Sequence, residues 1–251
     1  MSKYSNRCQQ VDLSDLNSTH TKIINLVGKG KKVIDFGCSS GYLDKVLKEK
    51  FNCKVWGLEL DPVDAEKAAK YCEKVITCDI DTYNWEAKLI KDAPFDVAIF
   101  ADVLEHLKDP VKVLKRTKPL LKPTGYILIS LPNIAHASVR LELLSGNFDY
   151  EKLGILDDTH LHFYTKKTAA EMIEGGGFYI ELIELREDPN LDFSPGFIKE
   201  YLSKLGIPFT DEVKALFEED DTKAFQYVFK ATAYPPKTYK GWRKAKFIKP
   251  A

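Results

Sequence analysis

Residues 33–43 read VIDFGCSSGYL, and this stretch decides how the rest of the chain is interpreted. An apolar run typical of a buried strand is followed by a turn that Gly37 and Gly41 bracket. Glycine lets a ligand approach the backbone where a side chain would block it. A dinucleotide fingerprint has GxGxxG spacing, whereas these glycines are spaced GxxxG, so a pyrophosphate cradle is not favoured. The alternative is a tight strand-to-helix turn without a ligand.

On either side of this stretch, short apolar runs alternate with longer amphipathic segments. Such alternation is typical of strand and helix units built on a mostly parallel sheet, so we predict an α/β fold in one domain. The predicted strands are KKVIDFG (31–37), CKVWGLEL (53–60), KVITCDI (74–80), FDVAIFA (95–101), GYILISLPN (125–133), FYIELIELR (178–186) and AFQYVFKATAY (224–234).

Three helices can be placed from their boundary signals. One is expected near residues 103–121. A second, near 166–175, should begin at Thr165 or Thr168 and end at the glycine run 175–177, because glycine tolerates the backbone of a helix end. A third, near the amino end, should be capped at Ser18 or Thr19.

Composition narrows the class of protein. The chain has 251 residues, 44% of them hydrophobic, which is enough for a sizeable core. No apolar run approaches the roughly 20 residues that cross a bilayer, and the start lacks a signal-peptide pattern, so we expect a cytoplasmic protein. The five cysteines show no CxxC spacing, which suits free thiols. With 37 basic and 37 acidic residues, the net charge of zero does not favour a nucleic-acid partner.

Polar residues follow the apolar runs where strands end. In an open parallel sheet, ligands bind beyond the carboxyl ends of the strands. Glu59 ends one run and could accept both hydroxyl hydrogens of a ribose diol. Asp79 could accept from an adenine amino group while Ile80 packs on the ring, with Asp81 as the competing position. The alternative for Glu59 is a solvated loop carboxylate, which suits the nearby Asp61 better.

These motifs, together with the strand FDVAIFADVLEHL, resemble the class I S-adenosylmethionine-dependent methyltransferases over roughly residues 18–186. The resemblance implies a Rossmann-like, doubly wound sheet of seven strands in the order 3-2-1-4-5-7-6, mostly parallel with an antiparallel last strand. It also implies S-adenosyl-L-methionine as cofactor. The residues it assigns to the cofactor are Asp35, Gly37, Cys38, Ser39, Gly41, Glu59, Leu60, Asp79, Ile80, Ala101 and Asp102.

Two polar clusters are candidates for the chemistry. ADVLEHL (101–107) carries Glu105 and His106, and DDTHLHFYT (157–165) carries His160. In one mechanism, His106 or His160 is the general base and Glu105 orients it. In the other, these three residues and Asp102 hold a divalent metal. The second rests on a resemblance to the ExxEH metal site of small-RNA ribose and quinone O-methyltransferases, from which this chain departs by having Asp102 in place of the first glutamate.

The segment SLPNIAHASVRLELLSGNFDYEKLGILDDTHLHFYT (130–165) is too long for a minimal connector. Its LPN and THLHFYT ends resemble bacterial methyltransferases of glycan and polysaccharide biosynthesis. Arg140 could pair with a phosphate or carboxylate, or lie on a solvated helix face. Candidate substrate contacts are Asn133, His136, Arg140, His162 and Tyr164.

The predicted organisation is a methyltransferase domain over 1–234 and a basic tail over 235–251. Within the domain we distinguish an amino-terminal lid helix (1–30), a substrate-covering segment (132–165) and an acidic insertion (187–223) that is a lid or a homodimer contact. Tyr4, Arg7 and His20 could reach the cofactor or acceptor. The tail binds phosphates or is a disordered end or linker.

The function predicted from the sequence is methyl transfer from S-adenosylmethionine to a small-molecule or glycan-precursor acceptor, at a sugar hydroxyl or a phosphate-type oxygen. Alternatives are an RNA ribose methyltransferase, an N-methyltransferase of an amino sugar, and a non-catalytic cofactor-binding protein. Zero net charge and the lack of an RNA-binding module oppose the RNA alternative.

Overall fold

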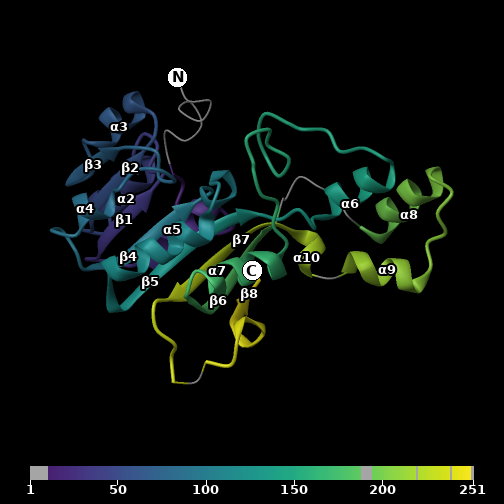
Figure 1. The fold of residues 1–251 in the computed structure, drawn as a ribbon. Helices are drawn as coiled ribbons and strands as arrows, with labels where there is room; N and C mark the ends of the chain where they lie inside the picture. Colours follow the sequence, from purple (N-terminus) through teal and green to yellow (C-terminus); the bar gives the residue numbers. More distant parts are fainter. Residues whose placement is uncertain (1–10, 188–193, 219, 238, 250–251) are drawn as a thin grey trace.

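A computed structural model of the protein describes residues 11–187, 194–218, 220–237 and 239–249 (Figure 1). Over these residues the strands form one sheet in the order β3-β2-β1-β4-β5-β7-β6-β8. Strand β7 is antiparallel to both of its neighbours, and the other neighbouring strands are parallel. The strands are β1 (Lys32–Phe36), β2 (Lys54–Glu59), β3 (Lys74–Thr77), β4 (Phe95–Ala101), β5 (Leu121–Pro132), β6 (Tyr179–Glu187), β7 (Ala224–Thr232) and β8 (Lys246–Ile248).

The predicted fold class and the order of the first seven strands are confirmed, but the strand count of seven is wrong. The described chain adds an eighth strand, β8, which pairs in parallel with β6. It comes from the segment that the sequence had marked only as a basic tail. Its three residues, KFI, lie among lysines and are too short to give a periodic signal.

The helices connect these strands and cover both faces of the sheet (Figure 1). They are α1 (Thr19–Val27), α2 (Tyr42–Glu49), α3 (Pro62–Ala68), α4 (Glu86–Leu89), α5 (Pro110–Thr117), α6 (Ala137–Leu144), α7 (Lys166–Gly175), α8 (Pro195–Lys204), α9 (Asp211–Glu218) and α10 (Asp220–Lys223). Short 3₁₀ helices are η1 (Leu104–His106), η2 (Lys118–Leu120) and η3 (Trp242–Lys244). None of the helices within the described residues is long and apolar enough to span a membrane.

Helix α7 begins where the sequence predicted. Thr165 is its N-cap, and a capping box joins Thr165 to Thr168, which satisfies backbone N–H groups of the first turn. Helix α1 also begins as expected after Ser18, although the Ser18 side chain makes no capping hydrogen bond.

The single helix expected near 103–121 is wrong. The segment is instead η1, a break, α5 and η2. The break has a local cause, because Pro110 lacks an N–H and Asp109 caps the new helix by accepting from the backbone N–H of Lys112. The short η1 turn therefore holds Glu105 and His106 apart from α5, at the edge of the sheet.

Two hydrophobic clusters lie on the two faces of the sheet, and a third lies outside it. On one face, α1 and α2 pack against residues such as Val33 and Ile99. On the other, α5 and α7 pack against residues such as Ile34 and Phe100. The third cluster joins α6 to α8 and α9 through Ala137, Leu141, Ile198, Leu202 and Phe217.

We call the group of α6, α8 and α9 the cap. Figure 1 shows these helices gathered beyond one end of the sheet. The cap unites the predicted covering segment with the predicted insertion, since α6 lies in 132–165 and α8 and α9 lie in 187–223.

Candidate active site

The loop after β1 has an unusual backbone at three positions. Gly37 and Gly41 have φ of 72° and 77°, and Ser39, between them, has φ of 49°. A Cβ at Gly41 would lie 2.8 Å from the Cα of Ala68, so the close approach of α3 also requires glycine there. The sequence pattern indicated a special backbone only at the two glycines. The serine is the third left-handed position of this loop.

Glu59, at the end of β2, is fixed against this loop. Its Oε2 accepts from the backbone N–H of Ser39 at 2.8 Å. Its Oε1 accepts from the N–H groups of Leu60 and Asp61, both at 2.9 Å. A carboxylate has about four lone-pair positions, so capacity remains to accept from a ribose hydroxyl. This position fits the role predicted for Glu59.

Asp35 lies beneath the loop. Its side chain is 3% exposed and contacts Asp44 of α2. Burial first, and then the charge of Asp44, raise the pKa of Asp35 well above its usual range. Cys38 is also buried, beside Cys72, and its thiol has a raised pKa chiefly through their hydrogen bond. These two side chains therefore support the loop from below, and a methionine chain lying on the loop would meet backbone.

The residues after β3 are divided between surface and core. Asp79 is exposed, and its carboxylate accepts from the N–H of Asp81 and the hydroxyl of Thr82. Ile80 is only 7% exposed and belongs to the sheet core. Asp81 accepts from the N–H of Lys108, which gives that acid a structural partner. Of the two acids after β3, Asp79 is thus the one that is exposed at the end of the strand.

Asp102, directly after β4, has φ of 54°. Its N–H donates to the hydroxyl oxygen of Ser130, and its Oδ1 accepts from that hydroxyl at 2.7 Å and from Nε2 of Gln226 at 3.0 Å. A left-handed aspartate costs roughly 1–3 kcal/mol and persists only where its surroundings hold it, which is typical of functional sites. The strain therefore supports a site role at the end of β4.

Neither Ser130 nor Gln226 was singled out from the sequence. Each is a polar residue inside an apolar strand, GYILISLPN or AFQYVFKATAY, and that interruption is the signal that could have found them. Gln226 also accepts at Oε1 from the hydroxyl of Thr19 (2.7 Å), so the start of α1 is joined to Asp102.

His20, on the same turn of α1, lies beside Asp102. Its Nε2 lies 3.2 Å from the hydroxyl oxygen of Tyr42. Burial lowers the pKa of His20, while the charge of Asp102 acts in the opposite direction. The start of α1 thus lies beside Asp102, through His20 directly and through Thr19 by way of Gln226. Tyr4 and Arg7 lie outside the described residues.

Glu105, His106 and His160 meet although they come from two separate segments. One ligand atom from each lies within 4.8 Å of the others. Nε2 of His160 is 3.9 Å from Oε1 of Glu105, and the two imidazole rings are 4.8 Å apart in an edge-on arrangement. Backbone N–H groups of Leu161 and His162 donate to the carbonyl of Glu105, which joins the two segments.

The hydrogen bonds of the two imidazoles fix which nitrogen is basic. Nδ1 of His160 lies 3.1 Å from the carbonyl oxygen of Ile155, and Nδ1 of His106 lies 3.2 Å from that of Thr159. A carbonyl oxygen only accepts, so each Nδ1 is the donor and each Nε2 carries the lone pair. Burial first, and then His106, lower the pKa of His160, which favours its neutral form.

Glu105 is the most unusual group of the cluster. It is 1% exposed, and neither carboxylate oxygen has a hydrogen-bond partner among the described residues. Burial first, and then Asp102, raise its pKa well above the usual range. A buried carboxyl without partners needs a proton or a cation. The donor set of one carboxylate and two imidazoles therefore fits a divalent metal as well as a proton-transfer role.

Two predicted substrate contacts have structural partners instead. Asn133 is fully buried, and its Nδ2 donates to the carbonyls of Asp221 and Ala224. Arg140 donates through Nε to the carbonyl of Ala135 and through Nη1 to that of Leu216. Asn133 thus joins the end of β5 to α10 and β7, and Arg140 joins α6 to α9, while an acceptor role for either side chain stays a prediction.

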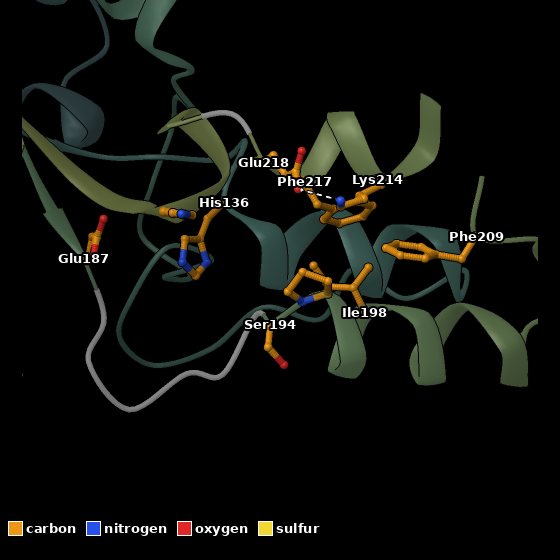
Figure 2. A pocket seen from close by; sticks show the side chains of 10 residues that line it. His136, Glu187, Ser194, Ile198, Phe209, Lys214, Phe217 and Glu218 are labelled. Atoms are coloured by element: carbon orange, nitrogen blue, oxygen red, sulfur yellow. Dashed lines mark ion pairs between the residues drawn. The ribbon is translucent and has the colours of Figure 1, made fainter. Parts of the chain in front are cut away.

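The other three predicted contacts lie near the candidate catalytic cluster or a cavity. His162 and Tyr164 are close to Glu105, and His136 lines a cavity. His162 and Tyr164 have ring centroids 6.0 Å apart, and the charge of Glu105 contributes, after burial, to the raised pKa of Tyr164. His136 is 1% exposed, caps α6 and borders a cavity of about 350 Å³. Figure 2 shows His136 and Glu187 at one end of this cavity, with Phe209 at the other, on the cap.

The strand order, the turn after β1 and the acids after β2 and β3 define a class I S-adenosylmethionine-dependent methyltransferase. Residues 15–183 match the family described as "Methyltransferase domain". The match covers well over half of the chain, which therefore belongs to this family.

Individual relatives agree with the family. A ubiquinone biosynthesis O-methyltransferase of Stutzerimonas stutzeri (strain A1501) is 31% identical over 136 residues, which cover 49% of this chain and 58% of that protein. One from Actinobacillus pleuropneumoniae serotype 7 (strain AP76) is 28% identical over 125 residues, covering 47% and 53%. The chain thus spans little more than half the length of these curated relatives.

A solved structure extends the likeness over most of the chain. A SAM dependent methyltransferase from Archaeoglobus fulgidus aligns with a TM-score of 0.56 at 17% identity, covering 88% of this chain and 94% of that one. At such an identity the likeness shows the fold alone.

Proposed function

We propose that the protein transfers a methyl group from S-adenosylmethionine to a hydroxyl oxygen of a small molecule. The observation that carries the proposal is the meeting of Glu105, His106 and His160 beside Asp102, at the carboxyl edge of the sheet. Two curated relatives of this chain carry the name of a ubiquinone biosynthesis O-methyltransferase, which supports oxygen as the acceptor atom.

S-Adenosylmethionine, when bound, supplies a methyl group that is already activated. The protein then has to place the acceptor oxygen in line, exclude water and take up the hydroxyl proton. His160 fits the last task, because its lowered pKa keeps it neutral and its Nε2 carries the lone pair. Glu105 lies 3.9 Å from that nitrogen, and in its ionised form its carboxylate would stabilise the imidazolium that forms.

A metal-assisted variant uses the same three side chains. Glu105 and the Nε2 atoms of His106 and His160 would hold a divalent cation. Such a cation lowers the pKa of a bound hydroxyl. The orphaned oxygens of Glu105 are the observation that supports this variant.

The finer substrate class within this proposal is a glycan precursor. Its support is the resemblance of the LPN and THLHFYT segments to methyltransferases of polysaccharide biosynthesis. Acceptors of the quinone type are the competing class, supported by the names of the curated relatives. The test must therefore include both.

The decisive experiment is methyl transfer from labelled S-adenosylmethionine to pools of phenols, nucleotide sugars and free sugars, with RNA as a further pool. We expect product only in a small-molecule pool, and its loss in His160→Gln. Loss of turnover on chelation, restored by a divalent metal, would favour the metal variant over the base variant. Failure to bind S-adenosylmethionine in calorimetry would overturn the proposal as a whole.

A further inference from the structure

Three aromatic side chains form a small group beside the candidate catalytic cluster. The ring centroid of Phe148 is 5.7 Å from that of Tyr150 and 5.8 Å from that of Phe163, and the Tyr150 and Phe163 rings are 6.2 Å apart. We call Phe148, Tyr150 and Phe163 the ring platform. Phe163 lies 15 positions after Phe148 and 13 after Tyr150, so the fold brings the three rings together.

The ring platform touches the candidate chemistry directly. The ring of Phe163 lies 6.0 Å from that of His160, which in turn lies 4.8 Å from that of His106. A ligand that stacks on the platform would therefore have only the ring of Phe163 between it and the imidazole of His160.

The platform is open to solvent to an unusual degree for grouped aromatic rings. Tyr150 is 60% exposed and Phe148 is 39% exposed, whereas the aromatic rings of the sheet core, such as Phe36 and Phe100, are fully buried. Aromatic faces exposed in a group are a surface on which another ring can stack.

The charge around the platform restricts what can bind. Residues 147–163 carry four carboxylates, on Asp149, Glu151, Asp157 and Asp158, and a single lysine. That lysine, Lys152, is engaged with Asp158 at 2.5 Å. The field here is negative, so a phosphate or carboxylate on the ligand would be repelled.

We propose that the ring platform binds the acceptor, and that the acceptor is an uncharged ring carrying the hydroxyl that is methylated. This inference rests on the proposed function and names its substrate class. An aromatic ring and a sugar ring share the needed chemistry, namely an apolar face that stacks and a hydroxyl at the edge. The same field disfavours RNA, a polyanion, as acceptor.

The test measures binding of four probes to the protein saturated with S-adenosylhomocysteine, by calorimetry and saturation-transfer NMR. Catechol and methyl glucoside are the neutral probes. Dihydroxybenzoate and glucose phosphate are their charged counterparts. We expect one neutral probe to bind more tightly than its charged counterpart, and its identity tells an aromatic acceptor from a sugar.

Variants locate the binding on the platform. Tyr150→Ala should lower the affinity for the neutral probe by about three- to tenfold, the range expected for one stacked ring. Tyr150→Phe should keep the wild-type affinity, because it retains the ring. Tyr234→Ala is the matched control, because Tyr234 is 57% exposed and lies two residues beyond the end of β7, away from the platform. The high exposure of both tyrosines means that neither variant is expected to unfold.

Several outcomes overturn the inference. They are no binding of either neutral probe, tighter binding of the charged probes, or equal affinity in Tyr150→Ala and the wild type. A change in sedimentation or vesicle binding in Tyr150→Ala, with unchanged probe affinity, would assign the platform to a second copy or a membrane instead. The proposed function is judged separately, by methyl transfer and cofactor binding, and survives if transfer persists while Tyr150 has no effect.

Discussion

Glu105 is the residue at which stability and function oppose each other most directly. Its carboxyl is buried without a hydrogen-bond partner among the described residues, and its pKa is raised well above the usual range by burial and by Asp102. A protonated glutamic acid at this position resembles glutamine in shape and charge. Replacement of Glu105 by glutamine should therefore leave the stability of the fold unchanged but impair methyl transfer.

Glu105→Gln is expected to keep the melting temperature of the wild type and to lose methyl transfer by about 100-fold or more, the usual effect of removing an acid–base group. Calorimetric titration with Mn²⁺ tests the metal variant in the same protein. Glu73→Gln, at an exposed acid, is the control and should change neither quantity. Full activity in Glu105→Gln would remove Glu105 from the site.

Ser39 is a second residue with a testable effect, because its backbone conformation lowers the stability of the folded protein. Its φ of 49° lies in the left-handed region, which glycine adopts freely and other residues adopt at a cost. Ser39→Gly should raise the free energy of unfolding by about 0.5–1 kcal/mol in urea denaturation. The neighbouring Ser40 has no positive φ, so Ser40→Gly should lower stability and serves as the control. Equal effects of the two changes would contradict the argument.

At this scale the sequence predicted what was local and missed what was distant. Gly41 and Glu59 lie where their patterns placed them, because each follows a strong apolar run. The contact of Asp102 with Gln226 spans 124 positions and depends on β7 returning beside β5, which no spacing in the sequence indicates. The structural roles of Asn133 and Arg140 were missed for the same reason.

Among the elements, β1 and α2 share an interaction that depends on pH. Asp35 of β1 and Asp44 of α2 are both buried and contact each other. Burial raises the pKa of Asp44 to about 6, and the Sγ of Cys72 donates to its Oδ2 at 3.3 Å. The folded protein therefore holds a proton that the unfolded chain releases at lower pH.

The sign of the effect follows from this difference. The pKa of Asp44 in the folded protein lies above the unfolded value of 3.8. Its contribution to the free energy of unfolding is therefore fully present below pH 3.8 and is lost as the pH rises through about 6. Asp44→Asn should flatten that decline and raise stability at neutral pH by on the order of 2 kcal/mol. Urea unfolding of both proteins at acid and neutral pH measures it. An unchanged pH slope would show that the pair does not share a proton.

The elements that differed from expectation did so for short-range reasons. The helix predicted over 103–121 is interrupted at Asp109 and Pro110, a cap-and-proline pair that was present in the sequence but outweighed by the apolar pattern around it. The start of α7 at Thr165 was predictable because its capping box lies within four residues.

For the whole molecule, the order of seven strands followed from the family resemblance, while the cap did not. The third hydrophobic cluster joins α6 to α8 and α9 across more than 50 residues of chain, so neither segment reveals its partner. What each segment shows alone is amphipathic character, which is equally compatible with a lid, an interface or a cap.

The eighth strand gives the last test, because it covers the edge that β6 would otherwise expose. Strand β8 pairs with Leu182, Ile183 and Glu184 of β6, and Phe247 and Trp242 pack against the core of one face. Deleting residues 241–251 should expose that edge and cost about 1–2 kcal/mol of stability through the lost apolar contact, together with faster aggregation.

The cofactor loop follows β1, and four strands, β4, β5, β7 and β6, lie between β1 and β8 in the sheet. Binding of S-adenosylmethionine should therefore persist in the truncated protein. Phe247→Asp keeps the chain length and should lower the melting temperature in the same way, whereas Lys244→Asp, at an exposed position of η3, should not. An unchanged melting temperature in both the deletion and Phe247→Asp would mean that β8 contributes nothing to the folded sheet. Loss of cofactor binding in a truncated protein that still melts cooperatively would mean that the edge and the site are coupled through the sheet.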